Sequence, residues 1–86
     1  MDEGNHRTPT REEIDEESRR IRRLRIVVQL ALGVIAQGQI PFDEAQELAS
    51  ATRRVALNLF PEGGPTYDLI YRPKFRRLMT EVYRLQ

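Results

Sequence analysis

Residues 26–36, IVVQLALGVIA, are the most restrictive stretch of this sequence, because only Gln29 and Gly33 interrupt a run of aliphatic side chains. The run lies in a segment from Thr10 to Gln37 that contains no proline and one glycine. This composition predicts the second half of one long helix. A helix that is apolar on nearly all sides must be covered on nearly all sides. We therefore expect the other helices, and a second copy of the chain, to cover it.

A chain of this size has a small hydrophobic core, so association with a second chain would add to its stability. With 86 residues, it is long enough for one domain only. A chain this short buries only about 60% of its unfolded surface. It contains no cysteine, so neither a disulfide nor a thiolate metal site stabilises it. We predict a single helical domain over residues 10–86, preceded by a disordered tail over residues 1–9 that holds the only histidine, His6.

Charge is arranged in blocks along the chain, although the formal net charge is only +1. Residues 1–18 carry a net charge of −5, residues 19–25 carry five arginines and no acid, and residues 72–86 carry +4. The N-terminus is acidic and polar, which is unlike a secretory signal. The apolar run is far shorter than the ~20 residues that span a bilayer. These features predict a cytoplasmic protein without a membrane segment.

The first helix is expected to begin at Thr10. Its hydroxyl and the Glu13 side chain have the spacing of a capping box, in which each side chain accepts a bond from the other residue's backbone amide. Acidic residues then precede basic ones, which suits i,i+4 ion pairs along the helix. The expected pairs are Asp15 with Arg19 and Glu16 with Arg20.

Apolar residues in this helix repeat every seven positions. The repeat consists of Ile14, Ile21, Val28 and Ile35, with Leu24 and Ala31 between them. Glu17 takes the first intervening position, so the apolar seam is narrow in the first half and broad in the second. A narrow seam flanked by charge is typical of a helix that pairs with one neighbour. Gly38 is expected to end the helix in the left-handed conformation.

The second helix is predicted from Phe42 to Leu59, after a start at Pro41. Its core face follows helical spacing and comprises Ala45, Leu48, Ala49, Thr52, Val55, Ala56 and Leu59. The connection to the first helix is short, so the two are expected to be antiparallel neighbours. Leu57 lies beside this face and is a candidate contact to a partner.

Prolines and glycines in residues 60–65 break the chain after the second helix. We expect a short helix over Tyr67–Arg72, capped by Thr66, and a kink at Pro73, which lacks a backbone N–H. A last helix then runs from Pro73 towards Leu85. The predicted fold is therefore all-α: a small bundle of three main helices, with a short or kinked segment near Pro73 and a long, central N-terminal helix.

Two basic groups are the strongest polar signals. The first consists of Arg19, Arg20, Arg22, Arg23 and Arg25, and the second consists of Arg72, Lys74, Arg76 and Arg77. These groups fit phosphate contacts, docking to an acidic protein surface such as residues 12–17 of another copy, or a solvated face. The sequence contains no pattern that indicates a catalytic, cofactor or metal site, and we expect no enzyme activity.

These observations predict a small interaction module that recruits or regulates a partner protein and forms a homodimer through the apolar half of the first helix. The candidate partner-binding residues are Ile21, Leu24, Val28, Leu57 and Tyr83. The alternative is a nucleic-acid-binding regulator that uses the two basic groups, Arg19–Arg25 and Arg72–Arg77.

Overall fold

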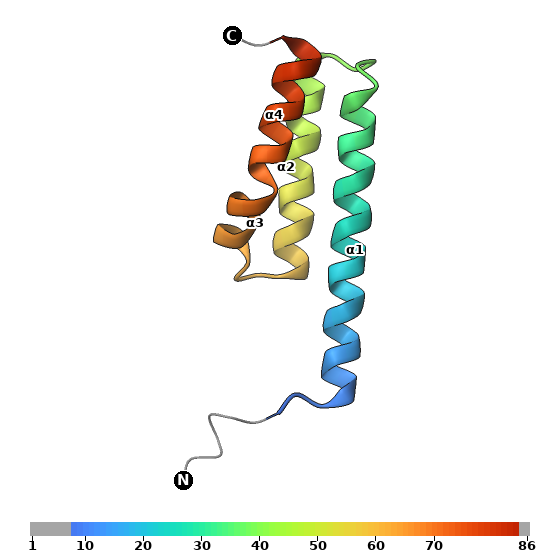
Figure 1. Cartoon of the computed structure of the whole chain (residues 1–86), viewed down its shortest axis with the longest axis vertical. Coiled ribbons are helices and arrows are strands. Elements are labelled where there is room, and N and C mark those ends of the chain that lie inside the picture. The colour runs from blue at the N-terminus through green and yellow to red at the C-terminus, as the bar shows by residue number, and fades with distance from the viewer. Residues whose placement is uncertain (1–7, 85–86) are drawn as a thin grey trace.

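The computed structural model describes residues 8–84 and contains four helices, α1 (Arg11–Ala36), α2 (Phe42–Leu59), α3 (Gly64–Ile70) and α4 (Arg72–Tyr83). No strand is present in this range. Helices α1, α2 and α4 lie side by side, and α1 extends beyond the other two at its N-terminal end (Figure 1). The molecule is elongated, with extents of 57 × 22 × 16 Å. The all-α bundle predicted from the sequence is confirmed.

Local signals in the sequence set both ends of α1. The capping box is present: the Glu13 amide donates to Thr10 Oγ1 at 3.1 Å, and the Thr10 amide donates to Glu13 Oε1 at 2.8 Å. At the other end, Gly38 has a φ of 69°, a conformation that a Cβ would strain. The Gly38 amide donates to the Ile35 carbonyl at 3.0 Å. The predicted start and stop of this helix are therefore confirmed.

The core lies where α1, α2 and α4 meet. Its buried side chains are Val28, Ala31 and Ile35 from α1, Ala45, Thr52 and Ala56 from α2, Tyr67 from α3, and Phe75 and Met79 from α4. The buried residues of α2 are small, which allows α1 and α4 to approach it closely. The buried Thr52 hydroxyl donates to the Leu48 carbonyl at 2.8 Å, so it does not leave an unpaired polar group in the core.

The C-terminal part is a bent helix whose two pieces, α3 and α4, are separated only by Tyr71. Pro73 has no amide to donate to the Leu69 carbonyl, and this missing bond allows the bend. The kink predicted at Pro73 is confirmed, but the predicted cap at Thr66 is wrong. Helix α3 begins at Gly64 instead, because Pro65 is compatible with a first helical turn.

Two polar contacts fix the bent helix to the rest of the chain. The Arg53 guanidinium donates two hydrogen bonds to Asp68, at 2.8 and 2.9 Å, and so joins α2 to α3. This arginine lowers the pKa of the Asp68 carboxyl. The Tyr83 hydroxyl donates to the Ile40 carbonyl at 2.7 Å and joins the last turn of α4 to the connection between α1 and α2.

Some predictions concern the ends of the chain. Most of the predicted disordered tail, residues 1–7, lies outside the described residues. The last helix ends at Tyr83, before the predicted Leu85, because Arg84 adopts the left-handed conformation that ends a helix. None of the described helices is long and apolar enough to cross a lipid bilayer.

Candidate docking surface on α1

The N-terminal part of α1 projects past the end of the bundle. Below the turn that joins α2 to α3, α1 continues without a neighbouring helix among the described residues (Figure 1). Arg20 marks the level of that turn, because its guanidinium lies 5.6 Å from the centre of the Phe60 ring. We call residues 11–19 the projecting segment. All of its side chains are exposed.

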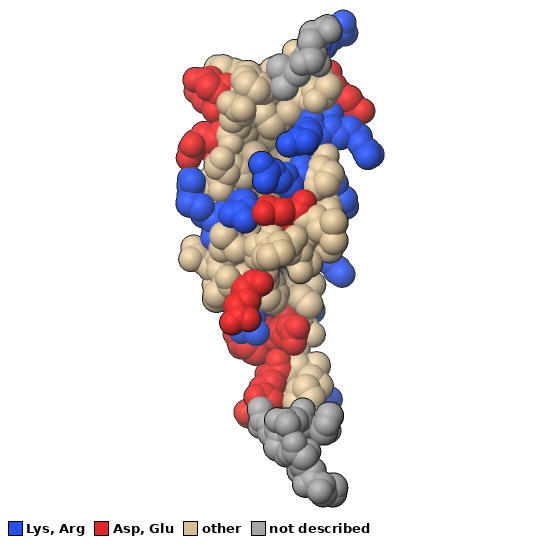
Figure 2. Space-filling model, turned by 90° about the vertical axis from the view of Figure 1, so that its left-hand side faces the viewer, with Lys and Arg blue, Asp and Glu red and all other residues tan. Residues whose placement is uncertain are grey.

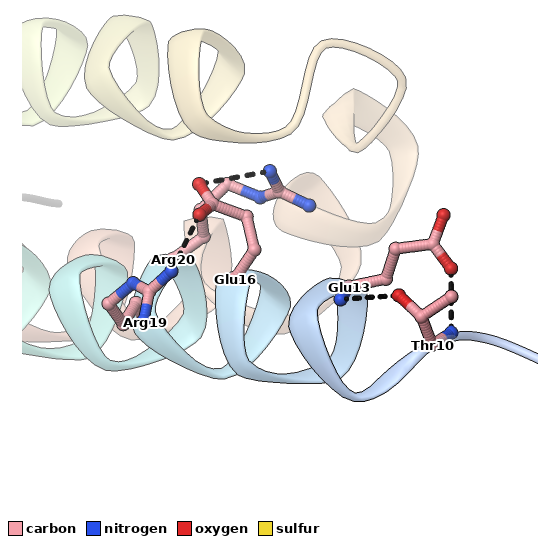
Figure 3. A network of polar contacts seen from close by, with 5 residues as sticks. All are labelled: Thr10, Glu13, Glu16, Arg19 and Arg20. Atoms are coloured by element: carbon pink, nitrogen blue, oxygen red, sulfur yellow. Dashed lines mark hydrogen bonds and ion pairs between the residues drawn. The ribbon is translucent and has the colours of Figure 1, made fainter.

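Local interactions hold the projecting segment in helical form (Figure 3). Beyond the capping box, Glu16 forms two ion pairs, with Arg19 at 2.8 Å and with Arg20 at 3.7 Å. The hydrogen bond from Arg19 lowers the pKa of Glu16. Arg19 thus pairs with Glu16 one turn away, and the expected pair of Arg19 with Asp15 does not form. Exposed pairs of this kind are screened by water and stabilise a helix only slightly.

Large apolar side chains of α1 remain exposed on two sides. On the side of the heptad repeat, Ile14 is 52% exposed and Ile21 is 38% exposed. Another set, which we call the outer stripe, consists of Ile26, Leu30 and Val34 at 54%, 65% and 42% exposure. Their spacing of four residues puts them on one side of the helix. The buried residues Val28, Ala31 and Ile35 occupy a different side. The bundle therefore covers one side of the apolar half of α1 and leaves the outer stripe uncovered.

An apolar groove of about 390 Å³ runs between α1 and α3. We call it the α1–α3 groove. Its lining residues are Ile21, Leu24, Ala56, Phe60, Gly63, Thr66, Tyr67, Ile70 and Tyr71. Ile70 is 47% exposed at its edge. Tyr67 is buried, which raises its pKa, and its hydroxyl has no hydrogen-bond partner within residues 8–84.

The groove follows from the bend in the C-terminal helix. Helix α1 packs against α2 and α4, whereas α3 packs against α2 and α4 and not against α1. In Figure 1, α3 lies on the side of α2 away from α1. The bend at Tyr71 therefore moves α3 away from α1 and leaves apolar side chains of both helices facing an open space. The sequence did not predict that Phe60, Ile70 and Tyr71 line a groove. Helix α3 is so short that the spacing of its apolar residues does not show which side faces the groove.

The five predicted partner-binding residues fall into two groups. Ile21 and Leu24 line the α1–α3 groove. Val28 is only 2% exposed and belongs to the chain's own core. Leu57 packs against Gly64, the first residue of α3. Tyr83 donates its hydroxyl to Ile40 and meets the Phe42 ring edge-on at 5.6 Å. The last three residues serve contacts within the chain, so the candidate docking surface retains Ile21 and Leu24 alone.

The two predicted basic groups lie on different helices. Arg72, Arg76 and Arg77 line a shallow hollow on α4 together with Asp68 and Glu81. Arg72 and Arg76 also line a second hollow, with Asp43 and Glu47 from the start of α2. On the face in Figure 2, most basic side chains lie on the wider body with acidic ones among them, and acidic side chains also line the narrow lower end. The basic surface of α4 is therefore partly neutralised by nearby carboxylates.

The group on α1 has a different setting. Arg19 and Arg20 both pair with Glu16. Arg22 and Arg25 form no ion pair within the described part of the chain, and both are exposed. The same holds for Asp15 and Glu17 in the projecting segment. The acidic block and the basic block of α1 therefore neutralise each other only in part.

The described residues offer little that is typical of a catalytic or metal site. Between residues 8 and 84, no three His, Asp or Glu side chains are grouped so that they could hold a metal ion. The carboxyl groups with a lowered pKa, Glu16 and Asp68, each face an arginine in an ion pair. Comparison with protein-family models, curated proteins and solved structures finds no match to this chain.

Proposed function

We propose that this protein is a small, non-enzymatic interaction module that self-associates through α1. One observation carries the proposal: after the described chain has folded, five large apolar side chains of α1 remain between 38% and 65% exposed. They are Ile14, Ile21, Ile26, Leu30 and Val34. Scattered apolar residues are common on protein surfaces, but contiguous ones mark interaction sites. The apolar groove beside Ile21 strengthens this argument, because it provides a concave surface next to the exposed residues.

The two exposed sides of α1 suit an adaptor. A protein that both self-associates and recruits a partner needs two separate surfaces. The heptad side with its groove and the outer stripe lie on different sides of the same helix. We propose that one mediates self-association and that the other binds a partner protein.

Sedimentation equilibrium over low micromolar to millimolar concentrations tests self-association. We expect the apparent mass to rise from one chain towards two. A surface control is Leu69→Glu, since Leu69 is 77% exposed on α3, is not among the groove residues and lies away from α1. This variant should associate like the wild type. A mass of one chain at all concentrations would refute the proposal.

The alternative proposal, a nucleic-acid-binding regulator, makes a different prediction. Each phosphate neutralised by a basic side chain releases counterions, so affinity falls steeply with salt. The carboxylates beside Arg72, Arg76 and Arg77 weaken the positive potential there. Titration of a short duplex at several salt concentrations separates the two proposals. Steep salt dependence that is lost when Arg22 and Arg25 are replaced by glutamine would favour the alternative.

A further inference from the structure

We propose that the α1–α3 groove holds the projecting segment of a second copy of this chain. The two α1 helices run antiparallel, and each copy fills the groove of the other. This inference rests on the proposed self-association and specifies its interface. A reciprocal arrangement of this kind has two-fold symmetry and closes at two copies.

The shapes of the two surfaces match. The groove is apolar, and the distance between the backbones of α1 and α3 leaves space beside Leu24. The large apolar side chain of the projecting segment, Ile14, is 52% exposed. Among residues 8–84, no helix lies beside this segment (Figure 1). An amphipathic helix lying in an apolar groove is a common mode of recognition. In this protein, the same chain provides both the groove and the amphipathic helix.

The heptad repeat and the buried part of α1 together determine the register of the pair. In an antiparallel pair of heptad helices, the first apolar position of one helix faces the intervening position of the other. Ile14 of one copy then faces Leu24 of the other, and Ile21 faces Glu17. A shift by one heptad would place Ile14 opposite Glu17, which does not line the groove, or opposite Ala31, which is only 4% exposed. The register with its symmetry axis close to Arg19 therefore remains. It places Ile14 in the partner's groove, where Leu24 and Ile21 form part of the wall.

The same register brings opposite charges together. The acidic block, residues 12–17, lies opposite residues 21–26, which contain three arginines. Asp15 and Glu17 in the first block, and Arg22 and Arg25 in the second, form no ion pair among the described residues. Lys74 does not line the groove, but its Nζ lies 5.7 Å from the centre of the ring of Tyr71, a groove residue, and adds positive charge nearby. Such complementarity favours the acidic segment of a second copy as the occupant.

The outer stripe fits a second copy less well. An antiparallel pair centred on Leu30 would place residues 23–25 opposite residues 35–37. No acidic residue lies in that range, so Arg23 and Arg25 would gain no opposite charge. The hollow beside the stripe is also smaller than the α1–α3 groove, at about 290 Å³ against about 390 Å³, and Arg25 and Gln29 line it together with Ile26 and Leu30.

Two matched variants, Ile14→Glu and Ile26→Glu, test the inference by sedimentation equilibrium. Both residues lie on α1 and are about half exposed, at 52% and 54%, so neither change disturbs the core. Circular dichroism checks that both variants keep their helical content. We expect Ile14→Glu to raise the dimer dissociation constant by about a hundredfold or more, because two unpaired carboxylates enter apolar grooves. Ile26→Glu should leave the constant within about threefold of the wild type.

Cross-linking tests the register independently, since the chain has no cysteine of its own. Ile14→Cys and Leu24→Cys variants are mixed and treated with a short bis-maleimide. We expect a covalent dimer from the mixture and little from either variant alone. A wild-type dimer that is broken by Ile26→Glu and not by Ile14→Glu, or that does not cross-link between these positions, would overturn this inference and leave the proposed self-association standing. A wild-type protein that stays monomeric would overturn both.

Discussion

The two halves of α1 share one heptad repeat but differ in what covers it. From Val28 onward, α2 and α4 cover the repeat, and Val28 and Ile35 are 2% and 0% exposed. In the first half, Ile14 and Ile21 continue the repeat at 52% and 38% exposure. Local caps and ion pairs hold this half in helical form, whereas packing holds the other. The apolar seam of α1 is therefore part of the chain's own core in the second half of the helix. In the first half it remains exposed and available to another molecule.

The largest expected loss of stability comes from a substitution in the packed C-terminal half of α1. Replacing Ile35 by alanine should lower the free energy of unfolding by about 2–5 kcal/mol, because the side chain is fully buried and its loss leaves a cavity. Urea denaturation followed by circular dichroism measures this change. Val34→Ala is the control on the adjacent residue, which is 42% exposed, and should cost less than about 1 kcal/mol. Equal losses for the two variants would contradict the contrast between the two sides of the helix.

Alanine substitutions at Gly33, inside α1, and at Gly38, just after it, should change the free energy of unfolding in opposite directions. Gly38→Ala should lower the free energy of unfolding by about 1–2 kcal/mol, because a φ of 69° strains a residue with a Cβ. Gly33→Ala should raise it by about 0.5–1 kcal/mol, since Gly33 lies inside the helix and an added Cβ there meets nothing within 4 Å. Thermal and urea unfolding of both variants check the two signs. Stabilisation by Gly38→Ala would show that Gly38 does not set the helix end.

Substitutions in or beside the projecting segment should affect the stability of that end of α1 and not of the bundle. Removal of the cap by Thr10→Ala should cost about 1 kcal/mol of helix stability at that end. Because residues 11–19 do not pack on the bundle, we expect faster amide exchange there in dilute solution, with little change in the melting temperature of the bundle. Thr10→Ser, which keeps the hydroxyl, should behave like the wild type. A large drop in the melting temperature of dilute Thr10→Ala would show that the segment is part of the folded core.

The smallest effect concerns the ion pair between α2 and α3. Asp68→Asn should lower the melting temperature slightly at neutral pH, since partly exposed ion pairs contribute little. Arg53 lowers the pKa of Asp68 in the folded state. The contribution of the pair is therefore present above the ordinary pKa of the carboxyl and is lost as the pH falls through the lowered value. The difference between wild type and variant should disappear in acid. A difference that grows as the pH falls would contradict this sign.

Local signals account for what was predictable from the sequence. Thr10, Glu13, Gly38 and Pro73 act on their own backbone or on residues within a turn, so the ends of α1 and the bend in the last helix followed from residue types alone. The start of α3 did not, because Gly64 and Pro65 suit a break and a first helical turn equally well.

The candidate site was only partly predictable for a different reason. The heptad repeat identified Ile21 and Leu24, but the groove beside them exists because the bend places α3 away from α1. That placement depends on how α2 and α4 pack, which no local pattern reveals. The same limit explains Val28, Leu57 and Tyr83: their neighbours within the chain belong to other helices, so spacing alone did not show whether a partner or the chain itself covers them.

Amide hydrogen exchange along α1, measured at low and high protein concentration, shows whether a second copy covers the N-terminal half of this helix. We expect amides of residues 14–23 to exchange quickly when the protein is dilute and to become protected as it is concentrated. Amides of residues 28–36, which the bundle already holds, should show the smaller change. Exchange of residues 14–23 that is the same at all concentrations would contradict the claim that this half of the helix is completed by a second molecule.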